Sequence, residues 1–202
     1  MTTTTNEIVW TDLLSGNNSN RAEAVFCDSI YTATVIGYST KLTSFDGAPP
    51  TPKTKLIMQL LDDNGKVCHI TSQPLSMSMH ERSGLRKMLT QYCKTTELAT
   101  LTERLSMDNV AIVRNGKFAW SNFIGWRTKL MISLQAGRDG KSYPNIMSYL
   151  PPGTDKHVVD KSVKVPAFFF EDAIDYQIMD GLSIWSKDQG TGDDFIDSLK
   201  NN

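Results

Sequence analysis

The stretch KLIMQLLDDNGKVCHIT, residues 55–71, contains two strands and the turn between them, and the rest of the fold can be worked out from it. Apolar side chains recur there at every second position: Leu56, Met58 and Leu60. Such alternation places them on one face of a strand at 55–62. Asn64-Gly65 favours a tight hairpin turn, because Gly and Asn accept positive φ angles. We therefore predict a hairpin whose second strand covers residues 67–71.

Two further elements flank this hairpin. Upstream, residues 29–40 are β-branched and aromatic and predict a strand, in which Gly37 marks a bend or bulge. Residues 41–54, with an Asp-Gly pair and three prolines, predict a long loop. Downstream, Ser78 and Glu81 have the spacing of a capping box, so a helix is expected to begin at Ser78.

The remaining elements follow in the same way. Residues 96–106 predict a second short helix, and residues 109–120 predict a small hairpin around an Asn-Gly pair. Residues 126–134 alternate as a strand, residues 137–141 form its turn, and residues 142–150 form the return strand.

This order of elements favours a mainly β protein with an OB-fold, a five-stranded Greek-key barrel with a helix between strands three and four. We place this domain at residues 25–153. A flexible N-terminal lead-in covers residues 1–24, and an acidic C-terminal extension covers residues 154–202, its last ten or so residues expected to be disordered. An unrelated α+β sandwich is the alternative architecture.

Charge is distributed unevenly along the chain, although the net charge is only −1. Residues 21–150 hold 16 Lys and Arg against 10 Asp and Glu, a net +6. Residues 151–202 hold 5 against 10, a net −5. A modestly basic domain therefore precedes an acidic extension, and arguments about charged partners apply to each separately.

Many of these cations fall on strand faces that point away from the apolar residues, or on hairpin turns. Single-strand nucleic-acid binding requires such cations for the phosphates and aromatic rings on which bases stack. The predicted phosphate contacts are Lys53, Lys55, Lys66, Arg127, Lys129, Arg138 and Lys141.

Three aromatic residues are predicted to contact bases. Tyr143 and Tyr149 share a strand parity opposite that of Ile146, so both are expected to point outward. Trp126 is included with them, although its parity with Leu130 also fits a place in the core.

The sequence predicts neither an enzyme nor a cofactor or metal site. Cys68 and His69 are adjacent, so in a strand they point to opposite faces, and no Cys-x-x-Cys pair is present. Residues 137–141 contain Gly-x-x-Gly-Lys but precede a strand, whereas a phosphate loop precedes a helix. No apolar run approaches the ~20 residues of a membrane span. With three scattered cysteines, the chain is expected to be cytoplasmic and not to contact membranes.

Two segments resemble a family of small bacteriophage proteins. LSMSMHERSGLRKML at residues 75–89 is similar to that family's L-S-L-H-E-K-S-x-L-R-K-x-L stretch. GWR at 125–127, GKSYPNI at 140–146 and PPG at 151–153 are similar to its G-K-x, D-G-K-x-Y-x-x-I and P-x-P ending. The family often has Trp-Gly-Arg where this chain has Tyr92 followed by Cys-Lys-Thr.

The resemblance covers about residues 28–153 and implies an OB-fold of a phage replication module that binds single-stranded DNA. On the matched positions, it implies a binding role for Lys129, Lys141 and Tyr143. The location would then be the cytoplasm of the bacterial host.

The C-terminal extension allows two interpretations. Its acidic and aromatic end resembles the tails with which single-stranded-DNA-binding proteins recruit replication or recombination partners, and Asp193, Asp194, Phe195 and Ile196 would form that tail. Alternatively, the apolar run at residues 168–170 folds onto the barrel or onto a second protomer.

We therefore predict a sequence-tolerant single-stranded-DNA-binding protein of a phage replication or recombination module. The alternative is a structural or assembly protein of the virion that uses an OB-like barrel without binding nucleic acid. The sequence leaves the oligomeric state open, a homo-oligomer included.

Overall fold

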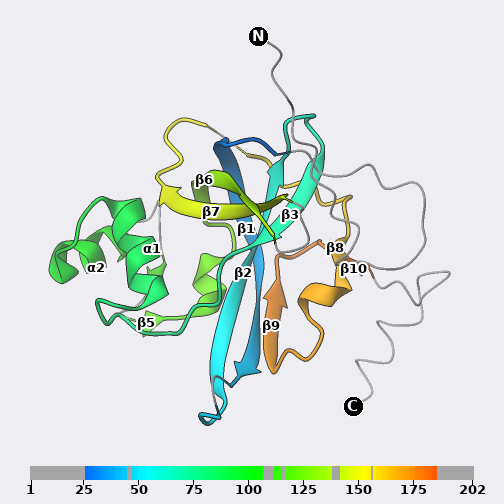
Figure 1. The fold of residues 1–202 in the computed structure, drawn as a ribbon. Helices are drawn as coiled ribbons and strands as arrows, with labels where there is room; N and C mark the ends of the chain where they lie inside the picture. Colours follow the sequence, from blue (N-terminus) through cyan, green and yellow to red (C-terminus); the bar gives the residue numbers. More distant parts are fainter. Residues whose placement is uncertain are drawn as a thin grey trace.

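The structure is a computed structural model that describes residues 26–44, 47–106, 112–114, 117–137, 142–155 and 157–185. An antiparallel sheet with the strand order β3-β2-β1-β6-β7 forms its centre, and β9 adds to β1 (Figure 1). The predicted mainly β class is confirmed. Helices α1 (Gly84–Cys93) and α2 (Leu98–Ser106) lie on one side of β1 and β2, and the C-terminal strands lie on the other (Figure 1).

The sheet strands are β1 (Ser29–Thr43), β2 (Thr51–Leu61), β3 (Val67–Thr71), β6 (Arg127–Ala136), β7 (Ser142–Leu150) and β9 (Asp175–Ile178). The helices are α1 (Gly84–Cys93), α2 (Leu98–Ser106), η1 (Trp120–Phe123) and η2 (Ala167–Phe169). Two small pairs complete the elements: β4 (Val113–Arg114) with β5 (Lys117–Phe118), and β8 (Val165–Pro166) with β10 (Ile184–Trp185).

The hairpin of β2 and β3 forms as predicted. Leu60 pairs with Cys68, and the apolar residues at alternate positions of β2 are fully buried. The Asp62 carboxylate accepts hydrogen bonds from the backbone N–H groups of Asn64 and Lys66, at 2.9 and 2.8 Å. Gly65 has φ 73°, which is the conformation that the Asn-Gly turn was expected to need.

The loop before this hairpin is shorter than predicted, because β1 and β2 continue to pair as far as Thr43 and Thr51. The expected loop of residues 41–54 thus shrinks to residues 44–50. Pro52 does not prevent the pairing, since it occupies the beginning of its strand, where proline is tolerated. We call the paired residues 39–43 and 51–55 the arm.

The predicted irregularity at Gly37 is a β-bulge. Val35 pairs with Met58 while Gly37 pairs with Ile57, so Ile36 is an extra residue of β1. The bulge sends Val35 and Ile36 into different apolar clusters on the two faces of the sheet.

The helical region begins later than predicted. Ser83, not Ser78, is the N-cap of α1, and its hydroxyl accepts a hydrogen bond of 3.1 Å from the backbone N–H of Arg86. The carbonyl of Ser78 accepts a hydrogen bond from the Ser83 hydroxyl instead, and residues 78–82 are not helical. Both Ser78 and Ser83 are residues that favour the N-cap position, and Ser83 is the N-cap because its hydroxyl accepts from the amide of the third helical residue.

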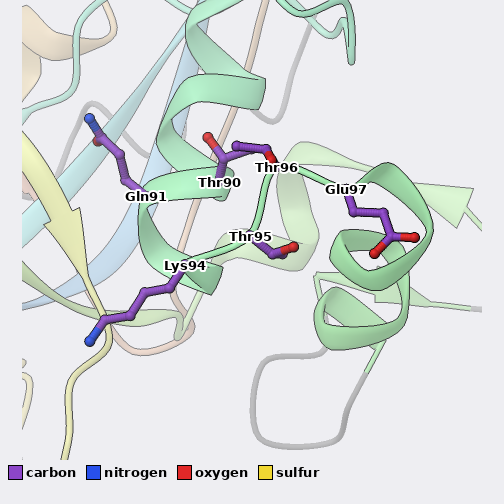
Figure 2. A pocket seen from close by; sticks show the side chains of 6 residues that line it. All are labelled: Thr90, Gln91, Lys94, Thr95, Thr96 and Glu97. Carbon is purple, nitrogen blue, oxygen red and sulfur yellow. The ribbon is translucent and has the colours of Figure 1, made fainter.

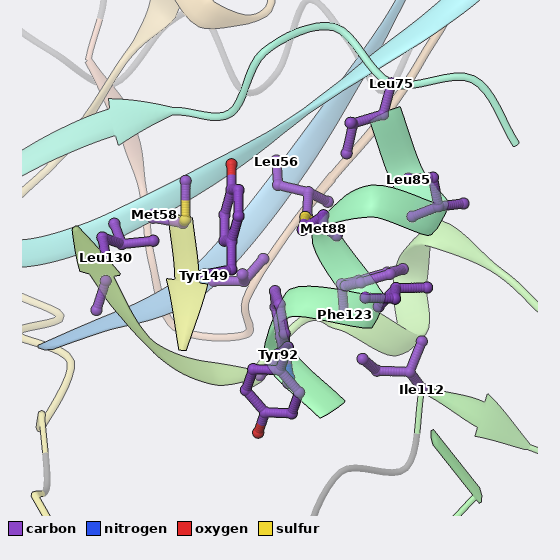
Figure 3. Packing of buried hydrophobic residues seen from close by; sticks show 14 of the residues in the cluster. Leu56, Met58, Leu75, Leu85, Met88, Tyr92, Ile112, Phe123, Leu130 and Tyr149 are labelled. Atoms are coloured by element: carbon purple, nitrogen blue, oxygen red, sulfur yellow. The ribbon is translucent and has the colours of Figure 1, made fainter. Parts of the chain in front are cut away.

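The main core lies between the sheet and the helices. Its side chains come from β2, β6 and β7, from α1, and from the segment around η1 (Figure 3). Members labelled in the figure include Leu56, Met58, Leu85, Met88, Phe123, Leu130 and Tyr149. Residues far apart in sequence therefore form one apolar cluster.

The opposite face of β1 and β2 has a second apolar cluster, here called the outer cluster, made of Ile36, Ile57, Val165 and Leu182. Phe169, Phe170, Ile178 and Met179 pack against it. The described part of the C-terminal extension, residues 157–185, thus folds onto the sheet of its own chain, as one of the two interpretations of the apolar run expected.

Candidate nucleic-acid interface

Tyr149 does not point outward, contrary to the prediction. Tyr149 pairs with Leu130, but Ile146 pairs with Ile132, so Met147 is an extra residue in β7. This bulge shifts the alternation by one, and Tyr149 joins Ile146 on the core face. Its side chain is only 8% exposed, and burial raises the pKa of its hydroxyl.

Trp126 is also a core residue and not a stacking surface. It is 4% exposed, and its ring lies 4.7 Å from that of Tyr92 and 5.5 Å from that of Phe123, centroid to centroid. Tyr149 stacks on it at 6.4 Å. These rings cannot reach a base without opening the core, so neither Trp126 nor Tyr149 belongs to the interface.

Tyr143 keeps the orientation that its parity predicts. It lies on the other side of the Met147 bulge, opposite Gln135, whose side chain is exposed. Tyr143 itself is half-buried. Arg138 and Lys141, between β6 and β7 in sequence, lie outside the described residues.

The two predicted cations of β6 differ in their surroundings. Arg127 is exposed and pairs with Thr34 of β1. Lys129 forms an ion pair with Asp155, its ammonium nitrogen 2.6 Å from a carboxylate oxygen. Because Asp155 follows the Pro-Pro-Gly segment, the beginning of the acidic extension already neutralises one predicted phosphate contact.

The arm gathers three lysines on one face. Lys41 lies directly opposite Lys53, and Lys55 lies opposite Ser39, so Lys41, Lys53 and Lys55 share a face. We call these three the lysine row. The ammonium of Lys53 donates a hydrogen bond to the neutral Ser76 hydroxyl. None of the three forms an ion pair with a carboxylate of the described residues.

Lys41 escaped the sequence prediction because residues 41–54 were expected to be a loop. The sequence did hold an indication, since Lys41, Lys53 and Lys55 would share one face if the two strands continued to pair through residues 41–54. Lys66 is exposed at the opposite end of β2 from the arm. The part of β2 from Lys55 to Leu61, about 20 Å at the rise of a β-strand, separates it from the lysine row. The predicted cations therefore do not form one patch.

The extension covers the middle of the sheet face that carries the lysine row. The Gln59 side chain is fully buried and binds the backbone of Asp160 twice: its oxygen accepts from N–H at 2.7 Å, and its nitrogen donates to C=O at 3.1 Å. Thr34 and His157 are likewise in hydrogen-bond contact at 3.1 Å. A ligand on this face is therefore restricted to the parts that the extension leaves open.

Two histidines are held at this covered face. Gln59 Nε2 lies 3.3 Å from His69 Nε2, and burial lowers the pKa of His69 to about 4. Burial also lowers the pKa of His157. Both rings are therefore favoured in their neutral form, and they serve the packing of the extension.

An open depression lies where α1 ends and α2 begins (Figure 2). Its lining residues are Thr90, Gln91, Lys94, Thr95, Thr96 and Glu97. Lys94 ends α1 with φ 51°, a left-handed conformation. One lysine and one glutamate balance each other here, so the depression has no charge preference for a polyanion.

Metal-ligand clusters and thiols of lowered pKa are both absent from the described residues. Within the described ranges, no three His, Cys, Asp or Glu residues lie close enough to hold a metal ion. Burial raises the pKa of the Cys68 thiol to about 12 and raises that of Cys93, which disfavours the reactive thiolate. No helix in the described part of the chain is long and apolar enough to cross a membrane.

Comparisons of the sequence with protein-family models and with curated proteins found no match.

Proposed function

We propose that residues 26–153 form an OB-fold. The order of elements supports this: three antiparallel strands, two helices, and then the hairpin of β6 and β7. The central strand β1 pairs with both β2 and β6, as in a Greek-key barrel. Between the described residues of β3 and β7 no ladder is present, so the proposed barrel is partly open.

We propose that the protein binds single-stranded DNA in a sequence-tolerant way. The observation that carries this proposal is the lysine row. Lys41 and Lys53 face each other across two strands with no carboxylate partner among the described residues. Like charges directly opposite are destabilising, and phosphate groups would remove that repulsion.

The proposed interface differs from that expected on sequence alone. It contains the lysine row and Arg127. Tyr143 lies near the opposite end of the same sheet face, beside Gln135 of β6, and we propose Tyr143, Arg138 and Lys141 as a separate group of contacts. Lys129 contributes only if its ion pair with Asp155 opens. A replication or recombination module of a phage, in the bacterial cytoplasm, is the proposed setting.

Binding is tested by fluorescence anisotropy of an oligo-dT and of a matched duplex across a salt series. We expect tighter binding of the single strand at low salt and a log-affinity that falls linearly with log salt. A Lys53→Gln/Lys55→Gln variant should flatten the slope by about 1.4, at about 0.7 for each lost phosphate contact. Lys87→Gln, an exposed lysine of α1, is the matched control. Equal affinity for both nucleic acids, or none for either, contradicts the proposal.

Partner recruitment by Asp193, Asp194, Phe195 and Ile196 remains a proposal, because these residues lie outside the described part of the chain. A chain truncated after Thr191 tests, in the same titration, whether this segment also competes with DNA. Tighter DNA binding by the truncated protein would support a tail that competes for the basic surface.

A virion assembly role is the second candidate, and one observation favours it. Ile30 and Met131 pair across β1 and β6, and their side chains are 54% and 46% exposed. Met131 also pairs with Ser148 of β7, and the residue before Ser148, Met147, is exposed as well. Exposed apolar groups of this kind are typical of protein contacts. This role predicts an oligomer that persists at all salt concentrations, which light scattering with and without oligonucleotide would reveal.

A further inference from the structure

The C-terminal extension places an aromatic residue next to the lysine row. On one edge of β1, Ser39 pairs with Lys55; on its other edge, Ser39 pairs with Tyr176 of β9. Directly paired residues share a face of the sheet, so Lys55, Ser39 and Tyr176 form a line across three strands. Two strand spacings, about 10 Å, separate the backbones of Lys55 and Tyr176.

The surroundings of Tyr176 leave its ring accessible and held in place. Its side chain is 41% exposed. The ring of Phe170 lies 5.1 Å away at an interplanar angle of 48°, and Phe170 itself packs against the outer cluster. Within the described residues, the Tyr176 hydroxyl has no hydrogen-bond partner. A ring supported from one side and open to solvent is the kind of surface on which a base stacks.

The acidic residue next to Tyr176 faces away from the lysine row. Asp175 pairs with Thr40, whose hydroxyl is buried against that of Thr54 on the core face. The Tyr38 hydroxyl lies 3.4 Å from an Asp175 carboxylate oxygen on that same face. Strand alternation therefore puts the negative charge of Asp175 on one side of β9 and the ring of Tyr176 on the other.

We propose that Tyr176 stacks on a base of single-stranded DNA whose phosphates lie along Lys41, Lys53 and Lys55. The site is then shared between the arm and the extension, and it rests on the proposed function. The extension has a positive role in this site, since it supplies the aromatic surface that the arm lacks. Sequence alternation in residues 175–178 was the available signal, but it did not reveal which strand edge β9 joins.

The test compares Tyr176→Ala, Tyr176→Phe and Gln177→Ala in the full chain, by oligo-dT anisotropy across salt. Tyr176→Ala should weaken binding about fivefold or more while leaving the salt slope unchanged, because stacking does not involve counterion release. Tyr176→Phe keeps the ring and should bind within about twofold of wild type. Gln177→Ala is the matched control, since Gln177 is exposed on the opposite face of β9.

The outcomes separate this inference from the proposed function. Wild-type binding that Tyr176→Ala leaves unchanged overturns the inference alone, whereas absence of wild-type binding overturns both. Equal losses in the Ala and Phe variants argue against stacking. Photocrosslinking of wild-type protein to an iodouracil-containing oligonucleotide provides a second measurement that needs no variant, and an adduct that maps away from Tyr176 counts against the site.

Discussion

Lys41 of β1 lies directly opposite Lys53 of β2, one residue beyond the last β1 residue that pairs with β9. In the free protein this arrangement costs energy, because like charges on directly paired residues repel. Stability and binding are therefore expected to respond in opposite directions when one of the two charges is removed.

Lys41→Gln should raise the free energy of unfolding by about 0.2–1 kcal/mol, since it removes the repulsion. The same change should weaken oligo-dT binding and flatten the salt slope by about 0.7. Urea denaturation and anisotropy measure the two effects. Lower stability together with unchanged DNA affinity would show that the lysine row is structural.

Gly37→Ala should destabilise the protein by about 1–3 kcal/mol, because overpacking forces the backbone to move. A Cβ atom at position 37 would lie 2.5 Å from the backbone oxygen of Gln177, so β9 would have to shift away from β1. Hydrogen exchange at the Met179 amide, which donates to the Ile36 carbonyl, should report that shift. Gly84→Ala is the control, because only the end of the Leu75 side chain lies near its Cβ position.

Stability should fall as the pH is lowered from about 6.5 to about 4. The fold lowers the pKa of His69 from 6.5 to about 4, so in this window the unfolded chain binds more protons than the folded one. The loss contributed by His69 is at most about 3 kcal/mol. Denaturation midpoints over a pH series should show a shallower decline for His69→Gln, with part remaining from His157.

Asp155→Asn should strengthen DNA binding, because it releases Lys129 from its ion pair. One additional phosphate contact would steepen the salt slope by about 0.7. Thermal stability should change by less than about 1 kcal/mol, since the Asp155 side chain is 54% exposed. Asp180→Asn makes the same change of charge at another exposed site of the extension. If both variants gain the same affinity for DNA, the gain comes from the change in net charge and not from the release of Lys129.

Local patterns predicted the local elements well. The alternation in β2 and the Asn-Gly turn describe one hairpin, whose strands and turn are adjacent in sequence, so the prediction needed no knowledge of distant residues. Gly37 was recognisable as an irregularity because glycine weakens the interior of a strand and therefore often marks a bulge.

Non-local features were harder to predict. Neither proline nor glycine stands next to the bulge at Met147, since Pro144 is three residues earlier, and one extra residue was enough to move Tyr149 from the expected surface into the core. Tyr176 was overlooked because its role depends on β9 joining β1, a pairing between segments more than a hundred residues apart in the chain. Sequence periodicity gives the face of a strand but not its neighbour.

Strand β1 shares one edge between two partners, β6 along residues 29–34 and β9 along residues 37–40. During synthesis, β6 emerges well before β9, so half of that edge keeps unpaired N–H and C=O groups until residues 175–178 have left the ribosome. An open edge is a template for pairing with other chains. Strand β9, which is made late, thus closes an aggregation-prone edge at the centre of the molecule, and a nascent chain that stalls before it would expose that edge.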